Sequence, residues 1–115
     1  GLAVHFLSHD PEVVAAYQRD PLVHNLLSAG AGMALLEGAG WLNKYTGEAP
    51  APLLLMHGGA DKITSAPATR ELAARLTGNI THREWPDLYH EIHNEKEKEE
   101  VFAFTLKWME SKLSA

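Results

Sequence analysis

The sequence of 115 residues contains no cysteine, which excludes a disulfide framework and a catalytic thiol but leaves the cellular compartment open. It also lacks any basic run, and its formal net charge of −5 disfavours a surface for nucleic acid. No apolar segment approaches the ~20 residues that a membrane-spanning helix requires. These absences leave a small globular domain as the simplest interpretation.

The composition is that of an ordinary folded domain. Hydrophobic residues make up 45% of the chain and charged residues 22%, so disorder is not expected. The length suffices for one small domain with its own core. The sequence opens at Gly1, without an initiating methionine and in the middle of an apolar pattern, so we expect a fragment or a processed chain.

The most informative stretch is PLLLMHGGAD, from Pro52 to Asp61. Its four apolar residues do not alternate with polar ones, which is typical of a strand buried on both faces in a parallel sheet. His57 and two glycines end the run, and we expect the glycines to adopt the backbone angles of a sharp turn. Asp61 then stands at the carboxyl end of the strand, where open α/β sheets collect their catalytic groups. The alternative is that Asp61 merely caps the following helix.

A helix and a second strand are predicted to follow. The helix covers residues 66–77, with Ser65 as its N-cap and Gly78 at the position of a C-terminal cap. Ile80–Trp85 alternates imperfectly between apolar and polar residues, which predicts a strand that is more exposed than the first. In that strand we expect His82 to face solvent.

The chain is predicted to be helical from Glu95 onward. Acidic side chains crowd the start and lysines lie towards the end, which suits the helix dipole. The acidic run Glu95–Glu100 alternates with lysines, so we interpret it as a solvated helical face. An apolar stripe is expected to pack on the sheet, with Val101, Thr105 and Trp108 beside it. The stripe consists of Phe102, Leu106, Met109 and Leu113.

Two further helices are predicted upstream. The first opens at Asp10-Pro11, because aspartate is a good N-cap and proline suits the first helical position, and it ends at Asp20-Pro21. The second covers residues 28–45 and is weakened by four glycines. Its apolar residues recur at helical spacing at Met33, Leu36, Ala39 and Leu42.

From Pro52 onward the predicted order is therefore strand, helix, strand, helix, which defines an α/β fold. Strands that are joined through a helix are usually parallel, so their carboxyl ends lie at the same edge of the sheet. Asp61 follows the first strand and His90 follows the second. We therefore expect these two side chains to lie side by side although they are far apart in sequence.

A carboxylate beside an imidazole is two thirds of a Ser-His-Asp triad. The aspartate orients the ring, and the histidine takes a proton from the nucleophile and returns it to the leaving group. In the hydrolases that carry their nucleophile in a G-x-S-x-G turn, the chain order is serine, acid, histidine. The sequence contains no such motif. Asp61 and His90 thus fit the last two members, with the serine expected upstream.

Three stretches carry a family resemblance: LLLMHGGADKITS, WPDLYHEIHNE and VFAFTLKWME. Together they resemble the C-terminal part of an α/β-hydrolase of the monoacylglycerol lipase and lysophospholipase group, within the serine-aminopeptidase-like hydrolases. HDPEVVAAYQRDPLVHN resembles the segment that closes the cap domain of that group. The resemblance implies that residues 1–48 are the end of the cap with a connecting helix. Residues 49–115 would be the C-terminal βαβα part of the core.

The resemblance also implies a function for the parent protein. Asp61 would be the triad acid and His90 the base, acting on lipid esters with no metal or organic cofactor. The serine and the oxyanion hole would lie in a missing N-terminal half, so this chain alone should be inactive. The apolar residues of 22–42 fit either a cap that guards a lipid pocket and touches the membrane surface, or ordinary core.

Several alternatives stay open. His93 competes with His90 as the base, and Asp87 is the nearest other candidate for the acid. His57 either lines the site or packs structurally. His90-x-x-His93 also has the ligand types of a metal site; its possible carboxylates are Glu91, Glu95 and Glu97. Finally, the chain could be a binding module that kept the hydrolase fold without catalysis.

Overall fold

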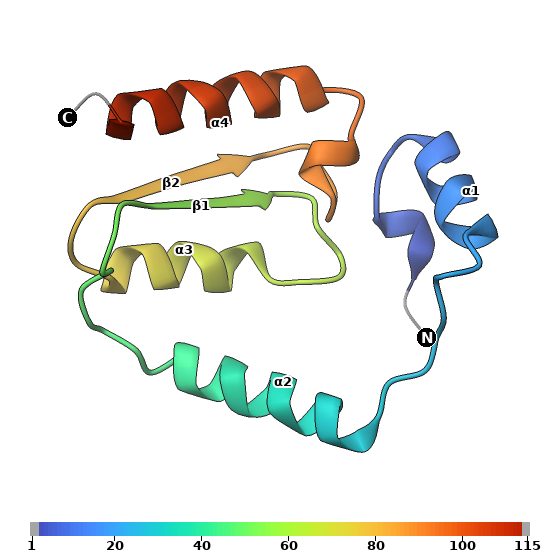
Figure 1. Cartoon of the computed structure of the whole chain (residues 1–115), viewed down its shortest axis with the longest axis horizontal. Helices are drawn as coiled ribbons and strands as arrows, with labels where there is room; N and C mark the ends of the chain where they lie inside the picture. The colour runs from blue at the N-terminus through green and yellow to red at the C-terminus, as the bar shows by residue number, and fades with distance from the viewer. Residues whose placement is uncertain (1–2, 114–115) are drawn as a thin grey trace.

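The structure is a computed structural model that describes residues 3–113. Gly1, on which the expectation of a fragment rested, lies outside the described residues. The helices and strands follow in the order α1, α2, β1, α3, β2, α4, with 3₁₀ turns at Val4–Phe6 and Ile92–Asn94 (Figure 1). Their bounds are α1 Pro11–Arg19, α2 Ala29–Leu42, β1 Leu53–Gly58, α3 Ala66–Arg75, β2 Ile80–Trp85 and α4 Lys98–Leu113.

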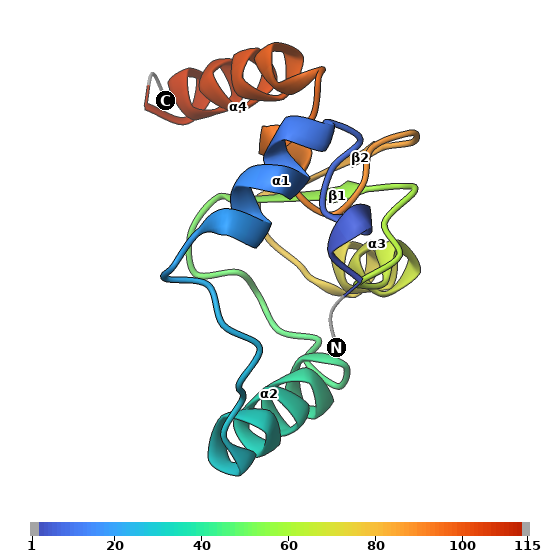
Figure 2. The same cartoon turned by 90° about the vertical axis from the view of Figure 1, so that its right-hand side faces the viewer.

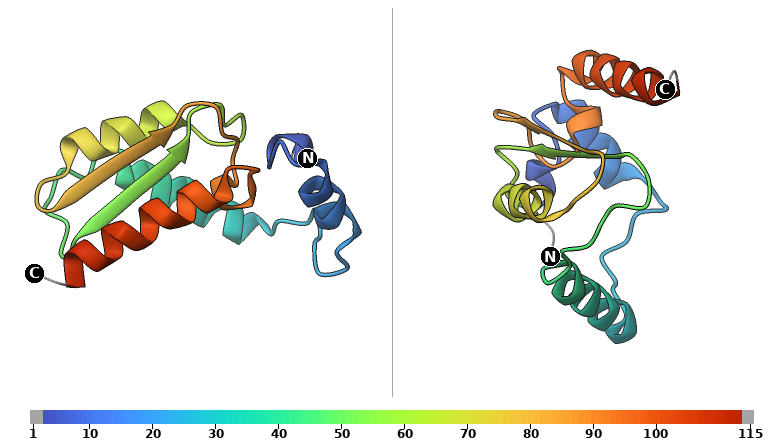
Figure 3. Two further views of the ribbon diagram at one scale, coloured as in Figure 1. Left: turned by 90° about the horizontal axis from the view of Figure 1, so that it is seen from above. Right: turned by 90° about the vertical axis from the view of Figure 1, so that its left-hand side faces the viewer.

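The two strands form a parallel sheet, as the sequence predicts. Their register runs from Leu53 beside Ile80 to Gly58 beside Trp85. Helix α3 covers one face of the sheet and α4 the other (Figures 1 and 3). Because both faces carry a helix, β1 needs no alternation of apolar and polar residues.

Helix α3 begins as predicted but ends earlier. The Ser65 hydroxyl accepts a hydrogen bond from the Ala68 N–H at 3.2 Å, which caps the first turn. The helix stops at Arg75, and its C-cap Leu76 has an extended backbone, so Gly78 is not the cap. Gly78 has a φ of 98° and turns the chain into β2 instead. Gly78 therefore marks the turn into β2, three residues beyond the last residue of the helix, and not the end of the helix itself.

The face of α4 that meets the sheet is not the predicted one. Phe104 packs edge-on against Trp85 at 5.9 Å, and the indole N–H of Trp108 donates to the Thr81 hydroxyl at 2.9 Å. The predicted stripe points away, with exposures of 49% for Phe102 and 84% for Leu113 among the described residues. Apolar residues occupy both faces of α4, so helical spacing alone could not select between them.

The expectation that His82 faces solvent is also wrong. The residue is half-buried, and its Nε2 atom is shielded without a hydrogen-bond partner in the described part of the chain. Side chains along β2 point alternately to the two faces of the sheet, but α3 covers one face and α4 the other, so alternation alone does not expose a residue (Figure 1). Arg83, the next residue, is the exposed one in this strand.

A small core lies between the sheet and α4, near the carboxyl ends of the strands. Its buried members come from the end of β2, the loop after it and the first turns of α4. Met56 and Phe104 pack against it. The buried members are Trp85, Leu88, Ile92 and Val101. This core fixes the loop that carries His90 to both the sheet and α4.

The upstream helices form as predicted. The Asp10 carboxylate accepts from the Glu12 N–H at 2.9 Å and caps α1, and Ser28 caps α2. Helix α2 lies apart from the sheet and buries none of its residues (Figure 2). The apolar side chains of this region are therefore not core among the residues described; they are Leu22, Leu26, Leu27, Met33, Leu35, Leu36, Trp41 and Leu42. Within residues 3–113, no helix is both long and apolar enough to cross a membrane.

Candidate active site

The loops that leave β1 and β2 are bonded directly to each other; we call these two loops, residues 58–65 and 85–91, the rim. The Gly59 N–H donates to the Trp85 carbonyl at 2.7 Å, and the Ala60 N–H donates to the Leu88 carbonyl at 3.0 Å. A methyl group added at Gly58 would lie 2.1 Å from the Tyr89 carbonyl oxygen. Glycine is required here for close approach of two backbones.

The expectation about backbone angles at Gly58 and Gly59 is accordingly wrong. Gly78 is the only glycine with a positive φ among the described residues. At Gly59 an added methyl would meet the Pro86 backbone at 2.7 Å. Glycine is required at both positions because the backbone of residues 85–91, the loop after β2, leaves no room for a side chain.

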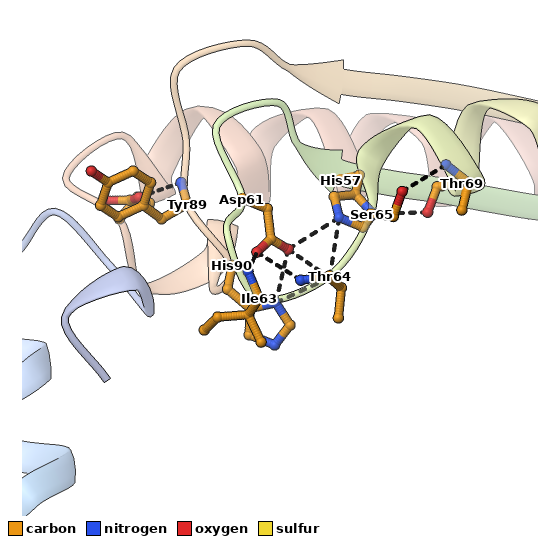
Figure 4. Close-up of polar contacts among 10 residues, drawn as sticks. His57, Asp61, Ile63, Thr64, Ser65, Thr69, Tyr89 and His90 are labelled. Atoms are coloured by element: carbon orange, nitrogen blue, oxygen red, sulfur yellow. Dashed lines mark hydrogen bonds and ion pairs between the residues drawn. The ribbon is translucent and has the colours of Figure 1, made fainter. Parts of the chain in front are cut away.

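The rim brings Asp61 and His90 together, as the parallel order of the strands predicts. The ring atom Nδ1 of His90 lies 2.9 Å from Oδ2 of Asp61 (Figure 4). The Asp61 side chain is 1% exposed and that of His90 is 34% exposed. Because an ionised carboxylate only accepts hydrogen bonds, Nδ1 carries the proton, and Nε2 is the nitrogen that can exchange a proton with a reacting group.

Asp61 accepts hydrogen bonds at both carboxylate oxygens. Oδ1 accepts from the N–H groups of Ile63 at 2.7 Å and Thr64 at 3.1 Å. Oδ2 accepts from the Thr64 hydroxyl at 2.6 Å and from His57 Nε2 at 3.1 Å, besides His90. Asp61 is thus not the cap of α3, a role that belongs to Ser65.

These donors decide the protonation of Asp61. Burial alone would raise the pKa of this carboxyl group, because a low-dielectric site disfavours its charge. The hydrogen bonds from Thr64, His90 and the Ile63 backbone outweigh burial, and they hold the pKa of Asp61 well below its usual range. Asp61 therefore stays ionised at every pH at which a histidine can act as a base.

His57 is a second imidazole on the same carboxylate. Its Nε2 donates to Asp61 Oδ2, so in the neutral ring Nδ1 accepts from the Thr69 hydroxyl at 2.8 Å. The side chain is 13% exposed. His57 therefore both lines the site and packs structurally, roles that the sequence left as alternatives. Thr64 and Thr69, which complete this network, gave no signal in the sequence beyond their nearness to Asp61.

A cavity of about 170 Å³ opens at the network. Its polar lining is Asp61, Thr64, His57 and His90. The arrangement can accept a proton from a hydroxyl group that approaches Nε2 of His90 and then stabilise the resulting imidazolium through Asp61. Among residues 3–113 no serine is hydrogen-bonded to His90, in keeping with the missing nucleophile motif.

The rival site residues lie elsewhere. His93 is exposed on the turn Ile92–Asn94, and Asp87 is exposed in the turn after β2. Within the described ranges, no three His, Asp or Glu side chains gather as metal ligands. Of the proposed metal ligands, Glu95 faces His9 and backbone N–H groups.

Glu95 is the main residue that the sequence analysis misplaced. It was expected on a solvated helical face, but α4 begins only at Lys98, and the Glu95 side chain is fully buried. Burial alone would raise the pKa of this carboxyl group, but hydrogen bonds from the Tyr89 N–H and from His9 outweigh it and lower the pKa of Glu95. The acidic run thus contains one buried anchor followed by exposed residues, a distinction that charge patterning does not reveal.

The parallel strands, the flanking helices and the rim with its acid and imidazole define the α/β-hydrolase fold. The backbone is similar to that in the crystal structure of monoacylglycerol lipase from Paleococcus ferrophilus, with a TM-score of 0.92 and 33% identity. The match covers 97% of this chain and 44% of that chain. Residues 1–97 match the family described as serine aminopeptidase, S33 (Hydrolase_4), and the chain belongs to this family.

Relatives in sequence agree with this assignment. Monoacylglycerol lipase of Mycolicibacterium smegmatis is 38% identical over 109 residues, and phospholipase YtpA of Bacillus subtilis is 33% identical over 105. An uncharacterised abhydrolase domain-containing protein of Dictyostelium discoideum is 35% identical. The matches cover 93%, 89% and 93% of this chain but only 39%, 40% and 12% of the respective relatives.

The expected resemblance to the C-terminal part of a monoacylglycerol lipase-like hydrolase is thus confirmed, as is the α/β fold class. The chain spans about two fifths of the lipases that it matches. The family is one of lipase- and esterase-type α/β-hydrolases.

The close approach at Gly58 generates a first prediction. Gly58→Ala in the full-length protein should force the rim loops apart and separate His90 from Asp61. Any reaction that depends on this pair should slow by about 100-fold, because small misplacements of catalytic groups have effects of that size. Gly38→Ala is the matched control, since an added methyl meets nothing within 4 Å there in the described chain. Steady-state kinetics of both variants test this, and equal rates for the two would contradict it.

Proposed function

We propose that the parent protein is a serine hydrolase that cleaves carboxylic esters of lipids, of the monoacylglycerol lipase or lysophospholipase type. Asp61 is its triad acid, His90 is its base, and the serine belongs to a part of the protein outside this sequence. The contact of 2.9 Å between His90 Nδ1 and Asp61 Oδ2 carries this proposal. The similarity to a monoacylglycerol lipase and to a phospholipase supports the substrate class.

The chemistry follows from the orientation of His90. Its Nε2 takes the proton of the serine hydroxyl as the oxygen attacks the ester carbonyl, and backbone N–H groups stabilise the oxyanion. The imidazolium then returns the proton to the leaving alcohol, and an acyl-enzyme remains. Water, activated in the same way by Nε2, releases the fatty acid and restores the serine.

Asp61 contributes through its charge and its direction. Its Oδ2 fixes the ring tautomer of His90 and lowers the free energy of the imidazolium. His57 and Thr64 hold the same oxygen, so that Asp61 cannot turn away from His90 during the reaction. No metal or organic cofactor takes part in this mechanism.

We further propose that residues 1–48 are the end of a cap with its connecting helix and that residues 49–115 belong to the hydrolase core. The exposed apolar side chains around α2 fit a cap above a lipid-binding pocket, with peripheral contact to a membrane surface. Release of fatty acid from a monoacylglycerol by the purified full-length protein tests the proposed function. A full-length protein without such activity, and without reaction with a fluorophosphonate, would favour the non-catalytic binding module.

His90→Ala should reduce kcat of the full-length enzyme on the order of 10⁶-fold, because loss of the triad base removes proton transfer in both steps. His93→Ala serves as the control and should retain much of the activity, since His93 is exposed on a separate turn. Near-normal turnover of the His90 variant in an ester hydrolysis assay would refute its assignment as the base.

Asp61→Asn should lower kcat by about 10⁴-fold, the size of effect known for the corresponding change in a serine protease. The carboxylate of Asp61 accepts hydrogen bonds from all of its partners, whereas the amide of asparagine has an NH₂ group in place of one oxygen and leaves some of these donors without an acceptor. Asp87→Asn is the control, because Asp87 is an exposed turn residue. If the Asp87 variant lost activity and the Asp61 variant kept it, Asp87 would be the acid.

A further inference from the structure

Glu95 is a buried carboxylate that the proposed mechanism does not use. Its Oε1 accepts from the Tyr89 N–H at 2.7 Å and lies 2.9 Å from Nδ1 of the His9 ring. Its Oε2 accepts from the His9 N–H at 2.8 Å and from the Ser8 hydroxyl at 3.2 Å. A buried charge is tolerated when hydrogen bonds satisfy it, and here both oxygens have two partners each.

These bonds hold the backbone that carries His90. Three consecutive N–H groups of the rim, those of residues 89–91, all have acceptors. The first donates to Glu95, the second to the Phe6 carbonyl at 3.4 Å and the third to the Leu7 carbonyl at 2.8 Å. The loop on both sides of His90 is therefore fixed to a carboxylate and to a segment more than eighty residues earlier.

Ring contacts fix the residue next to His90 as well. The His9 ring stacks on the Tyr89 ring with centroids 3.6 Å apart and an angle of 23°. Phe6 packs edge-on against the same Tyr89 ring, with the two ring centroids 5.5 Å apart. Tyr89 is thus held by its backbone through Glu95 and by its ring through His9 and Phe6.

On this geometry, and resting on the proposed function, we propose that Glu95 is a positioning residue for the base His90. It touches neither Asp61 nor the His90 side chain among its hydrogen bonds, and it acts through the Tyr89 backbone. The same Glu95 carboxylate binds Ser8 and His9, so the alignment of the base also depends on the segment that precedes α1. Motion of that segment is transmitted to His90 through Glu95.

Glu95→Gln tests this with little change of volume. Glutamine keeps one of the two accepting oxygens and replaces the other by an NH₂ group, which only donates. In one orientation of the amide this NH₂ group would face the Tyr89 N–H, and in the other orientation it would face the His9 N–H. Glu97→Gln is the matched control, because it makes the same substitution at an exposed position two residues away. Both variants are made in the full-length protein and compared by circular dichroism, steady-state kinetics and proton NMR.

The expected result is a fall in kcat of about 10-fold to 100-fold for Glu95→Gln, with KM nearly unchanged, since the base is misaligned while lipid binding is kept. The downfield proton resonance of the His90 Nδ1–H bond to Asp61, assigned by its loss in His90→Ala, should shift or broaden. Glu97→Gln should leave the rate and the resonance as they are. Unchanged kcat and resonance in a folded Glu95→Gln protein would overturn the proposal.

A second variant covers the case in which Glu95→Gln does not fold. His9→Phe keeps the ring stack on Tyr89 but removes the bond to Oε1, so it should shift the same resonance and lower kcat without raising KM. An unaltered resonance and rate in His9→Phe would then overturn the proposal. The resonance also separates the two claims: a wild-type protein that shows it without hydrolysing esters refutes the proposed function, while its response to Glu95→Gln still decides the positioning role.

Discussion

The structure of the rim depends on one constraint: the ionised carboxylate of Asp61 is buried, so hydrogen bonds from the protein must stabilise its charge. Five hydrogen bonds converge on its two oxygens, from two backbone N–H groups, one hydroxyl and two imidazoles. Each donor requires a particular approach of the loops after β1 and β2. Gly58 and Gly59 permit that approach because any side chain there would strike the opposite backbone. The charge, the glycines and the parallel strands are therefore parts of one constraint.

His90 lies between two buried carboxylates that act on it differently. Asp61 binds its ring directly, while Glu95 holds the backbone of the preceding residue. The small core of Trp85, Leu88, Ile92 and Val101 holds the loop between β2 and α4, which carries both His90 and Glu95. Because the Glu95 carboxylate also binds the segment before α1, the N-terminal and C-terminal parts of this chain meet at Glu95, beside the backbone that carries His90.

Much of this could be predicted from the sequence, and the omissions have physical causes. The apolar run of β1, the caps Ser65 and Asp10 and the shared edge of parallel strands are local or topological, so they predicted the fold and the meeting of Asp61 with His90. The burial of Glu95 and the packing face of α4 depend on contacts between distant segments. Charge patterning and helical spacing describe neighbours along the chain, and they assigned both features to the wrong environment.

The central claim is that His90, oriented by Asp61, serves a serine as its base. The most direct measurement is a crystal structure of the full-length protein after inactivation by an alkyl phosphonate, which bonds covalently to a reactive serine. The account predicts a phosphonylated serine whose Oγ lies within about 3 Å of Nε2 of His90, the reach of a general base, with Nδ1 still on Asp61. An adduct beside His93, or no serine adduct at all, would contradict it.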